Sequence, residues 1–255
     1  MALRNLQKWH GAGNDFLVEV IEHGTAPWWT PEHARAICAR TTGVGADGLL
    51  VATVGSEITM TLYNADGSIA EMSGNGIRCL AAAVHRATNA TWDTVEIKSA
   101  AGPRTVTLWL DGFSGSGSVA MGEVAQLGDI DGALGVVNLG NPHVVVLDDP
   151  TWSVSTCEGI ATELSERVGG ANVEFLRVLE SNHLAIRVIE RGVGWTSACG
   201  TGSCAAAAVA HRAGLSDADV TVTNPGGGLR VSLHDGWATL SGPVQFVANV
   251  EWLES

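Results

Sequence analysis

Basic residues are scarce in this chain of 255 amino acids. Lysine and arginine total 14 against 27 aspartate and glutamate residues, so the formal net charge at pH 7 is −13. Such a chain repels phosphate backbones and anionic lipid headgroups, and we expect neither nucleic acid nor a membrane as a partner. The only lysines are Lys8 and Lys98, and neither stands in a recognisable Schiff-base setting, which disfavours an enzyme that depends on pyridoxal phosphate.

Long apolar runs and cysteine pairs at metal-binding spacing are also missing. No apolar stretch reaches transmembrane length, and the first residues, MALRNLQKWHGAGNDF, contain no signal-peptide core. The five cysteines are an odd number, and Cys199 and Cys204 are too far apart for a C-x-x-C pair. We therefore expect reduced thiols, a cytoplasmic location and no metal site.

Glycine is plentiful, and it marks a sequence that repeats itself. The stretch SGNGIRCLAAAVHRA from Ser73 resembles CGTGSCAAAAVAHRA from Cys199. Weaker matches occur along the whole chain at nearly the same offset, such as GNDFLV from Gly13 with GNPHVVV from Gly140. We interpret the chain as two homologous halves, residues 1–122 and 123–255. Chance similarity between glycine-rich loops is the alternative interpretation.

Each half is predicted to contain strands, one main helix and further strands. The segment 76–87 and its counterpart from Gly200 are apolar nearly all round, which predicts buried helices wrapped by sheet. A third helix is predicted over 30–42, with Thr30 as N-cap and Pro31 at its first position. Strands are predicted at 15–20, 48–53, 57–64, 94–100, 104–110, 117–122, 184–190, 219–224 and 229–242.

These elements define an α+β protein of two pseudo-symmetric α/β domains, each a sheet around a central helix. The segment 244–252 is a further predicted strand. The sequence leaves open whether the last twelve or so residues return with it to the first domain.

Ser73 and Cys199 each stand directly before G-x-G and a helix. The first N–H groups of a helix lack internal partners and carry partial positive charge, so they bind a carboxylate and lower the pKa of a cysteine placed there. If the halves pack about a pseudo-twofold axis, both helix N-termini face one cleft, and one small ligand lies between Ser73 and Cys199.

This arrangement suits the inversion of a carbon stereocentre. The reaction needs a base on one face of the carbon and an acid on the other, and two equivalent positions supply both. The proton α to an amino-acid carboxylate is very weakly acidic, so the enzyme must stabilise the developing enediolate. Two helix N-termini directed at the carboxylate do so without a cofactor.

Six motifs, in order and across nearly the whole chain, resemble the diaminopimelate epimerase family: HGAGNDF, YNADGSIAEMSGNGIRC, GNPH, ANVEF, ERGVG and ACGTGSCAAA. The resemblance implies an isomerase that uses two thiols and no cofactor to interconvert LL- and meso-diaminopimelate, in lysine and peptidoglycan biosynthesis. It also implies two similar α/β domains, a site in the cleft between them, and a homodimer.

The same resemblance implies the site residues. Cys199 matches one catalytic thiol, Ser73 stands where the other is expected, and His143 and Glu190 match residues that tune the thiols. Arg191 matches the residue that binds the distal carboxylate. The remaining implied substrate-binding residues are Asn14, Asn64, Asn141, Asn172 and Glu190, with Gly74, Asn75, Gly200 and Thr201 cradling the reacting carboxylate.

The residues themselves leave plainer interpretations open for three of these positions. Asn64 in YNADGS can simply make a turn, His143 can be a structural histidine, and Arg191 can be a surface charge. Cys79 and Cys204 lie within predicted helices, where core thiols are expected.

Ser73 departs from the family pattern, because a hydroxyl is a far weaker acid than a thiol. A helix N-terminus stabilises an anion by about 0.3–2 kcal/mol, while each pKa unit costs about 1.36 kcal/mol, so the helix alone cannot make Ser73 an alkoxide. Three interpretations follow: a Cys→Ser variant made to trap a complex, a natural serine–cysteine enzyme like some in the related proline-racemase superfamily, or a binding protein without turnover.

Trp195 is the second departure, since the family usually has an acidic residue there. The side chain either reshapes the pocket or packs beside the loop. A racemase of another amino acid, such as histidine, therefore stays open. A phenazine-type isomerase of similar fold is disfavoured, because that class uses a carboxylate base.

Overall fold

The computed structural model describes residues 3–26 and 28–253, and the chain forms two compact units. The first runs to Val119 and resumes at Gly242, and the second comprises Ala120–Ser241. Strand β17 (Trp237–Leu253) therefore begins in the second unit and ends in the first. None of the helices within the described residues is both long and apolar enough to cross a membrane.

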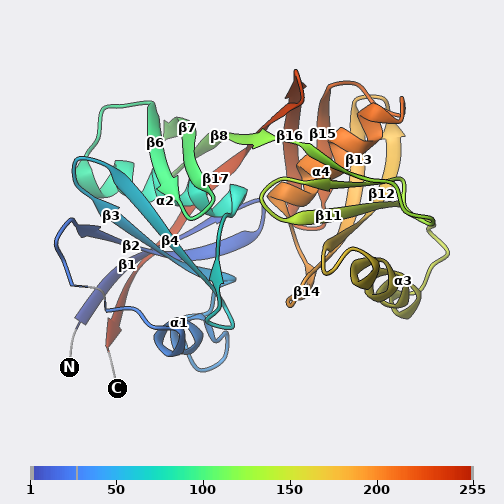
Figure 1. Ribbon diagram of the computed structural model, residues 1–255. Coiled ribbons are helices and arrows are strands. Elements are labelled where there is room, and N and C mark those ends of the chain that lie inside the picture. The colour runs from blue at the N-terminus through green and yellow to red at the C-terminus, as the bar shows by residue number, and fades with distance from the viewer. Residues whose placement is uncertain (1–2, 27, 254–255) are drawn as a thin grey trace. The chain divides into compact units, whose positions relative to one another are not determined.

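The first unit is a mixed sheet around one helix (Figure 1). Helix α2 (Gly74–Thr88) contacts strands along this sheet, from β1 to β7. Strand β17 pairs with both β1 and β8, so the sheet order β17–β1–β2–β3–β4–β6–β7–β8 closes on itself. The other elements are β1 (Leu3–Gly11), β2 (Asn14–Glu22), α1 (Pro31–Cys38), β3 (Gly48–Val54), β4 (Ile58–Asn64), β5 (Ile69–Ala70), β6 (Thr94–Ser99), β7 (Gly102–Asp111) and β8 (Ser114–Glu123).

The second unit also surrounds a helix with sheet. Helix α4 (Gly200–Arg212) contacts β10, β11, β12, β13, β15 and β16. The remaining elements of this unit are β9 (Ala125–Gly128), β10 (Gly135–Asn138), β11 (Pro142–Leu147), α3 (Val154–Arg167), β12 (Asn172–Glu180), β13 (His183–Glu190), β14 (Gly194–Thr196), β15 (Asp219–Asn224), β16 (Gly227–His234) and the first part of β17.

The two units share one order of strand pairings. In the first, β2 and β3 are parallel across α1, and β4 and β6 are parallel across α2. In the second, β11 and β12 are parallel across α3, and β13 and β15 are parallel across α4. Parallel neighbours need such crossovers, whereas the intervening pairs are antiparallel in both units.

The central helices consist largely of small, apolar residues, as the sequence predicts. In α2, Ile77 and Leu80 are fully buried together with the run Ala81–Ala83, and in α4 the run Ala205–Ala207 is fully buried. Alanine has high helix propensity, and its small side chain lets strands approach the helix from every side. The prediction of buried central helices is therefore confirmed.

Of the two outer helices, the sequence predicts α1 but not α3. Thr30 caps α1 by accepting a hydrogen bond from the His33 N–H, and Pro31 is its first residue, as predicted, although the helix ends at Cys38. Helix α3 was not predicted. Its N-cap is Ser153, and the side chains it buries, Cys157, Ala161 and Leu164, are too few to give a strong apolar pattern.

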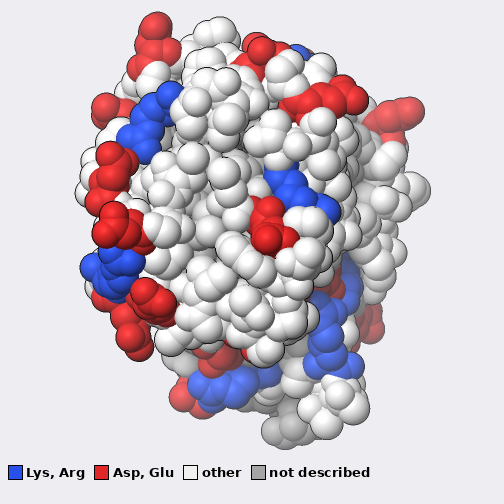
Figure 2. All heavy atoms as spheres, turned by 90° about the vertical axis from the view of Figure 1, so that its right-hand side faces the viewer, with Lys and Arg blue, Asp and Glu red and all other residues white. Residues whose placement is uncertain are grey.

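Figure 2 shows one face of the molecule, seen from the right-hand side of Figure 1. Basic side chains on this face are interspersed with acidic ones and with broad uncharged areas. The basic side chains on this face do not form an uninterrupted patch.

Candidate active site

Ser73 is the N-cap of α2. Its Oγ accepts a hydrogen bond from the Gly76 N–H at 3.0 Å. The hydroxyl proton is then left to donate to another group. Gly74, Asn75 and Gly76, which form the first turn of the helix, are buried.

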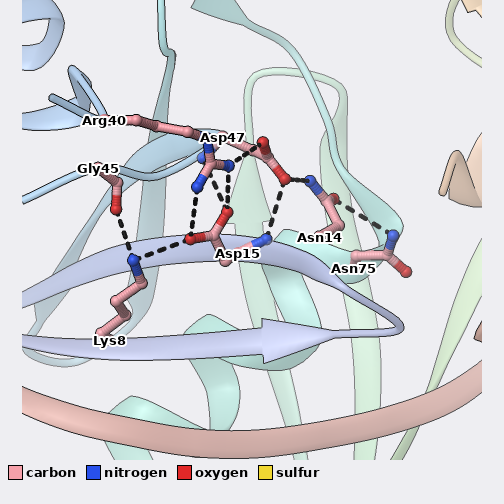
Figure 3. A network of polar contacts seen from close by, with 7 residues as sticks. All are labelled: Lys8, Asn14, Asp15, Arg40, Gly45, Asp47 and Asn75. Carbon is pink, nitrogen blue, oxygen red and sulfur yellow. Dashed lines mark hydrogen bonds and ion pairs between the residues drawn. The ribbon is translucent and has the colours of Figure 1, made fainter. Parts of the chain in front are cut away.

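A chain of polar contacts fixes two of the predicted substrate-binding asparagines in the first unit (Figure 3). Arg78 donates to Asn75 Oδ1 at 2.8 Å, and Asn75 Nδ2 donates to Asn14 Oδ1 at 3.3 Å. Asn14 Nδ2 in turn donates to Asp47 Oδ2 at 2.7 Å. Arg40 holds the other oxygen of Asp47 at 2.7 Å. Because Arg78 can only donate and the Asp47 carboxylate can only accept, the orientations of the Asn75 and Asn14 amides are fixed.

Asp15 joins the same network and braces it. Its carboxylate accepts from Arg40 at 2.7 Å and lies 2.9 Å from Lys8 Nζ. Burial acts to raise the pKa of Asp15, but the hydrogen bonds from Arg40 and Lys8 outweigh it, so the pKa lies below its ordinary value. Lys8 also donates to the Gly45 carbonyl at 2.6 Å, so this lysine is committed to structure.

Asn64 lies in a turn at the end of β4. Its Nδ2 donates to Ser68 Oγ at 3.0 Å, and its backbone N–H donates to the Ser68 carbonyl at 2.8 Å. The structure therefore contains the turn that was the plainer interpretation of Asn64 in YNADGS.

Cys199 is the N-cap of α4 and is 5% exposed. Its Sγ accepts from the Gly202 N–H at 3.3 Å and lies 3.5 Å from Thr201 Oγ1. Its own N–H donates to Asn224 Oδ1 at 3.3 Å. Asn224, which the sequence analysis missed, is buried and ties β15 to the start of the helix.

Two more buried groups lie next to this helix terminus. His143 on β11 and Glu174 on β12 are both fully buried, and His143 Nδ1 lies 2.7 Å from Glu174 Oε1. The other ring nitrogen lies 3.0 Å from Asn141 Oδ1. His143 is thus part of a polar cluster. Glu174 was missed, although a charged residue inside the apolar run NVEFL was a signal.

Glu190 completes the cluster from β13. Thr196 Oγ1 donates to its Oε1 at 2.7 Å. Burial raises the pKa of Glu190 and the Glu174 charge raises it further, while hydrogen bonds from Thr196 and the Cys199 thiol act in the opposite direction. Thr196 is a site residue that no motif singled out.

The predicted lowering of the Cys199 pKa is wrong. Burial raises the pKa of this thiol well above its ordinary value, and the Glu190 and Glu174 charges add to the effect. The Thr201 hydroxyl and the Gly202 N–H lower it by less. Burial can shift a pKa by several units, whereas a helix N-terminus contributes about 0.3–2 kcal/mol. The thiol is therefore the resting form.

Asn172 and Arg191 lie at neighbouring strand ends. Asn172 Oδ1 accepts from the Arg191 N–H at 2.9 Å, which leaves its NH₂ group for a ligand. The Arg191 guanidinium is exposed and donates to the Gly170 carbonyl at 3.3 Å.

Trp195 packs beside α3. Its indole N–H donates to Glu158 Oε1 at 3.1 Å, and its ring lies 6.1 Å from the Phe175 ring. The next residue on the strand, Thr196, contacts Glu190 instead, because successive strand residues point to opposite faces. Trp195 therefore lies away from the cluster around Cys199.

Among the described residues, no group of three or more His, Cys, Asp and Glu side chains is arranged to hold a metal ion. Cys38, Cys79 and Cys157 are buried free thiols. Burial raises the pKa of Cys38 and of Cys79 to about 12. Such thiols are inert at neutral pH, which fits the core role expected for Cys79.

The fold is that of solved racemases and epimerases. A structure described as a predicted epimerase from Pseudomonas aeruginosa matches with a TM-score of 0.77 and 15% identity, covering 99% of this chain and 100% of the other. A hydroxyproline epimerase from Agrobacterium vitis matches with a TM-score of 0.72 and 15% identity, over 98% and 92% of the two chains. At this identity the likeness concerns the fold alone.

Sequence comparison is more specific. The profile of the diaminopimelate epimerase family matches residues 6–127 and 135–247. A diaminopimelate epimerase from Synechocystis sp. is 37% identical, over 97% of this chain and 98% of its own length. The chain therefore belongs to the diaminopimelate epimerase family, whose named members are isomerases, as the motifs predict.

Proposed function

We propose that this chain interconverts LL- and meso-diaminopimelate by moving the proton on the α-carbon, without pyridoxal phosphate or a metal. Family membership over both halves of the chain supports the substrate. The observation that carries the chemistry is Cys199, a thiol that caps a buried helix beside two buried carboxylates. Both lysines are engaged in ion pairs, Lys8 with Asp15 and Lys98 with Glu57, which supports a mechanism without a Schiff base.

We propose further that the two units arose as halves of one duplicated domain, near residues 1–122 and 123–255, with the last strand returning to the first. The shared order of strand pairings supports this history. So does the equivalent place of Ser73 and Cys199, each the N-cap of the central helix of its unit.

In the proposed reaction, the group at one helix N-cap removes the α-proton and the other delivers a proton to the opposite face. Cys199 acts as thiolate in one direction and as thiol in the other. The N–H groups of Gly74–Asn75 and Gly200–Thr201 bind the reacting carboxylate and stabilise the enediolate as charge develops on it. His143 and Glu190 tune the Cys199 thiol. The reaction requires that residues 73 and 199 reach the same α-carbon.

The remaining candidates bind the substrate. Asn172 and Asn141 each have one amide oxygen engaged by the protein, so their NH₂ groups are available to carboxylate oxygens. Asn14 and Asn64 are the binding candidates of the first unit, and Arg191 binds the distal carboxylate. The Arg191 side chain is exposed, so its guanidinium is accessible to a substrate carboxylate.

Ser73 makes the enzyme asymmetric. Cys199 lies near the Glu190 and Glu174 charges, whereas the Ser73 hydroxyl is held by the Gly76 N–H. A hydroxyl in that setting donates a proton poorly. We therefore expect slow turnover in this chain and faster turnover once a thiol replaces it.

Two alternatives remain. A racemase of another amino acid is supported by the hydroxyproline epimerase, which shares the fold. A ligand-binding protein without turnover is supported by Ser73.

We also propose a homodimer in the cytoplasm. Buried reduced thiols support a reducing compartment, and the exposed Trp109 and Phe113 offer apolar surface for association.

Incubation with LL-diaminopimelate in D₂O, with the α-proton followed by NMR, tests the proposal. The protein and a Ser73→Cys variant are run side by side. Exchange and epimerisation by the variant, faster than by the protein itself, support the assignment. If neither touches LL-diaminopimelate and another amino acid exchanges, the substrate is wrong. Tight binding without any exchange in either protein identifies a binding protein.

A further inference from the structure

Thr201, the second residue of α4, carries a hydroxyl for which the proposed reaction has no use. Its backbone N–H is assigned to the reacting carboxylate, whereas its side chain is buried, and the residue is only 7% exposed. A buried hydroxyl needs a hydrogen-bond partner. Thr201 Oγ1 lies 3.5 Å from Cys199 Sγ, so the sulfur of the proposed proton carrier provides that partner.

The first turn of α4 directs two groups at this one sulfur atom. The Gly202 N–H donates to Cys199 Sγ at 3.3 Å, and the Thr201 hydroxyl approaches the same atom. In the thiol form, either the sulfur or the hydroxyl can be the donor. The thiolate has no proton, so there the hydroxyl must donate. Because a hydrogen bond to a charged acceptor is the stronger one, the contact favours the thiolate whichever group donates in the thiol form.

The equivalent side chain of the first unit is used differently. Asn75 is the second residue of α2, as Thr201 is of α4. Its amide oxygen accepts from Arg78 at 2.8 Å, and its amide nitrogen donates to Asn14 at 3.3 Å. The side chain at this helix position therefore serves the N-cap residue in the second unit and the asparagine network in the first.

The surroundings of Cys199 oppose its ionisation, so a donor to the sulfur is needed. Burial is the main cause that raises the pKa of Cys199, and the charges of Glu190 on β13 and Glu174 on β12 add to it. His143 on β11, which contacts Glu174, is the other titratable group of this cluster. The hydrogen bond from Thr201 is the largest influence in the opposite direction.

We propose that Thr201 is a further catalytic residue, whose hydroxyl donates to the Cys199 thiolate while Cys199 removes the α-proton of the amino-acid substrate. As the C–H bond breaks, the S–H bond forms and the electron pair of the carbon passes into the carboxylate to give the enediolate. Thr201 keeps its own proton throughout. The inference rests on the proposed function, because it takes Cys199 as the group that moves the proton.

The first test needs no substrate. Thr201→Val keeps the shape of the side chain and lacks the hydroxyl, whereas Thr201→Ser keeps the hydroxyl. The rate at which iodoacetamide alkylates Cys199, measured by mass spectrometry between about pH 7 and pH 9, follows the thiolate fraction. We expect Thr201→Val to react roughly threefold to tenfold more slowly than the unchanged protein, and Thr201→Ser to react within about twofold of it. An undiminished rate in folded Thr201→Val overturns the inference.

Thr162→Val in α3 is the matched control for this test. The Thr162 hydroxyl is exposed and donates to the Glu158 carbonyl at 2.9 Å, so its loss should leave the alkylation of Cys199 unchanged. Alkylation in urea gives the rate of the unfolded thiol. If circular dichroism shows that Thr201→Val does not fold, Thr201→Ala, which also lacks the hydroxyl, takes its place with the same expected loss.

The second test separates the hydroxyl from the backbone N–H groups that bind the carboxylate. The Kd of LL-diaminopimelate, measured by calorimetry, should be the same in Thr201→Val, because these N–H groups remain. The faster of the α-proton exchange rates from LL- and meso-diaminopimelate in D₂O should fall roughly threefold to tenfold, and Thr201→Ser should restore it. A raised Kd with unchanged alkylation would show that the hydroxyl binds the substrate instead, and would contradict the inference.

The two tests also separate this inference from the proposed function. Slower alkylation of Thr201→Val in a protein that binds no diaminopimelate contradicts the substrate and leaves the hydrogen bond to the thiolate standing. Turnover of diaminopimelate with equal alkylation of Thr201→Val and the unchanged protein contradicts the role of Thr201 alone.

Discussion

Gly202 in the first turn of α4 provides a sharp test of how closely Glu174 approaches the Cys199 helix. A Cβ added there would lie 2.6 Å from Glu174 Oε1 and 3.2 Å from Cys199 Sγ. Ordinary contact begins at 3.4 Å, so the carboxylate would have to retreat by about 0.8 Å. It is fully buried and held by His143, so it cannot swing aside as an exposed side chain would.

The magnitude follows from two opposing terms. Overpacking a buried site costs about 1–3 kcal/mol, while replacing glycine by alanine in a helix gains at most about 1 kcal/mol. With the full gain subtracted, Gly202→Ala should lower the free energy of unfolding by up to about 2 kcal/mol. Gly159 in α3 is the matched control, because a Cβ there has no neighbouring atom within 4 Å.

Urea unfolding of the three proteins, followed by circular dichroism, measures the difference. Gly159→Ala should unfold at a higher urea concentration than the unchanged protein, and Gly202→Ala at a lower one. If both variants are stabilised equally, the Glu174 carboxylate does not lie against the start of α4, and the account of the cluster is wrong.

Two further predictions concern the thiol and the first unit. Because the pKa of Cys199 is raised, its alkylation by iodoacetamide should stay slower than that of an unfolded thiol from pH 7 to above pH 9, and the stability that the buried thiol contributes should be lost as pH rises beyond that point. Mass spectrometry of each cysteine in the native protein and in urea measures the alkylation rate, and equal rates for Cys199 in the two states would contradict the raised pKa. Asp47→Leu removes the acceptor that orients Asn14 and should weaken diaminopimelate binding about tenfold. Glu163→Gln on the exposed face of α3 is the calorimetric control, and an unchanged affinity in Asp47→Leu would show that Asn14 does not depend on Asp47.

The sequence was most informative where one feature decides the structure. Ser73 is predictable as a helix N-cap because a capping residue followed by G-x-G and an alanine run admits few alternatives. Cys199 is predictable because the repeat places it at the equivalent position. Helix α3 was missed because it buries few side chains, Cys157, Ala161 and Leu164, so its apolar period is weak.

The electrostatics of the site could not be predicted from local sequence. The helix N-terminus at Cys199 is visible in the chain and suggests a lowered pKa. The opposing burial and the charges of Glu174 and Glu190 come from strands β12 and β13. Only the folded chain brings these distant residues together, and their effect on the thiol exceeds that of the helix.

The central claim is that Cys199 is the effective proton carrier and that Ser73 is the weak one. The most direct measurement follows α-proton exchange in D₂O from LL- and from meso-diaminopimelate separately, with Cys199→Ser as control. The account predicts exchange faster than inversion from the isomer whose α-proton Cys199 removes, much slower exchange from the other, and none in Cys199→Ser. Equal exchange from both isomers, or exchange that persists in Cys199→Ser, would contradict it.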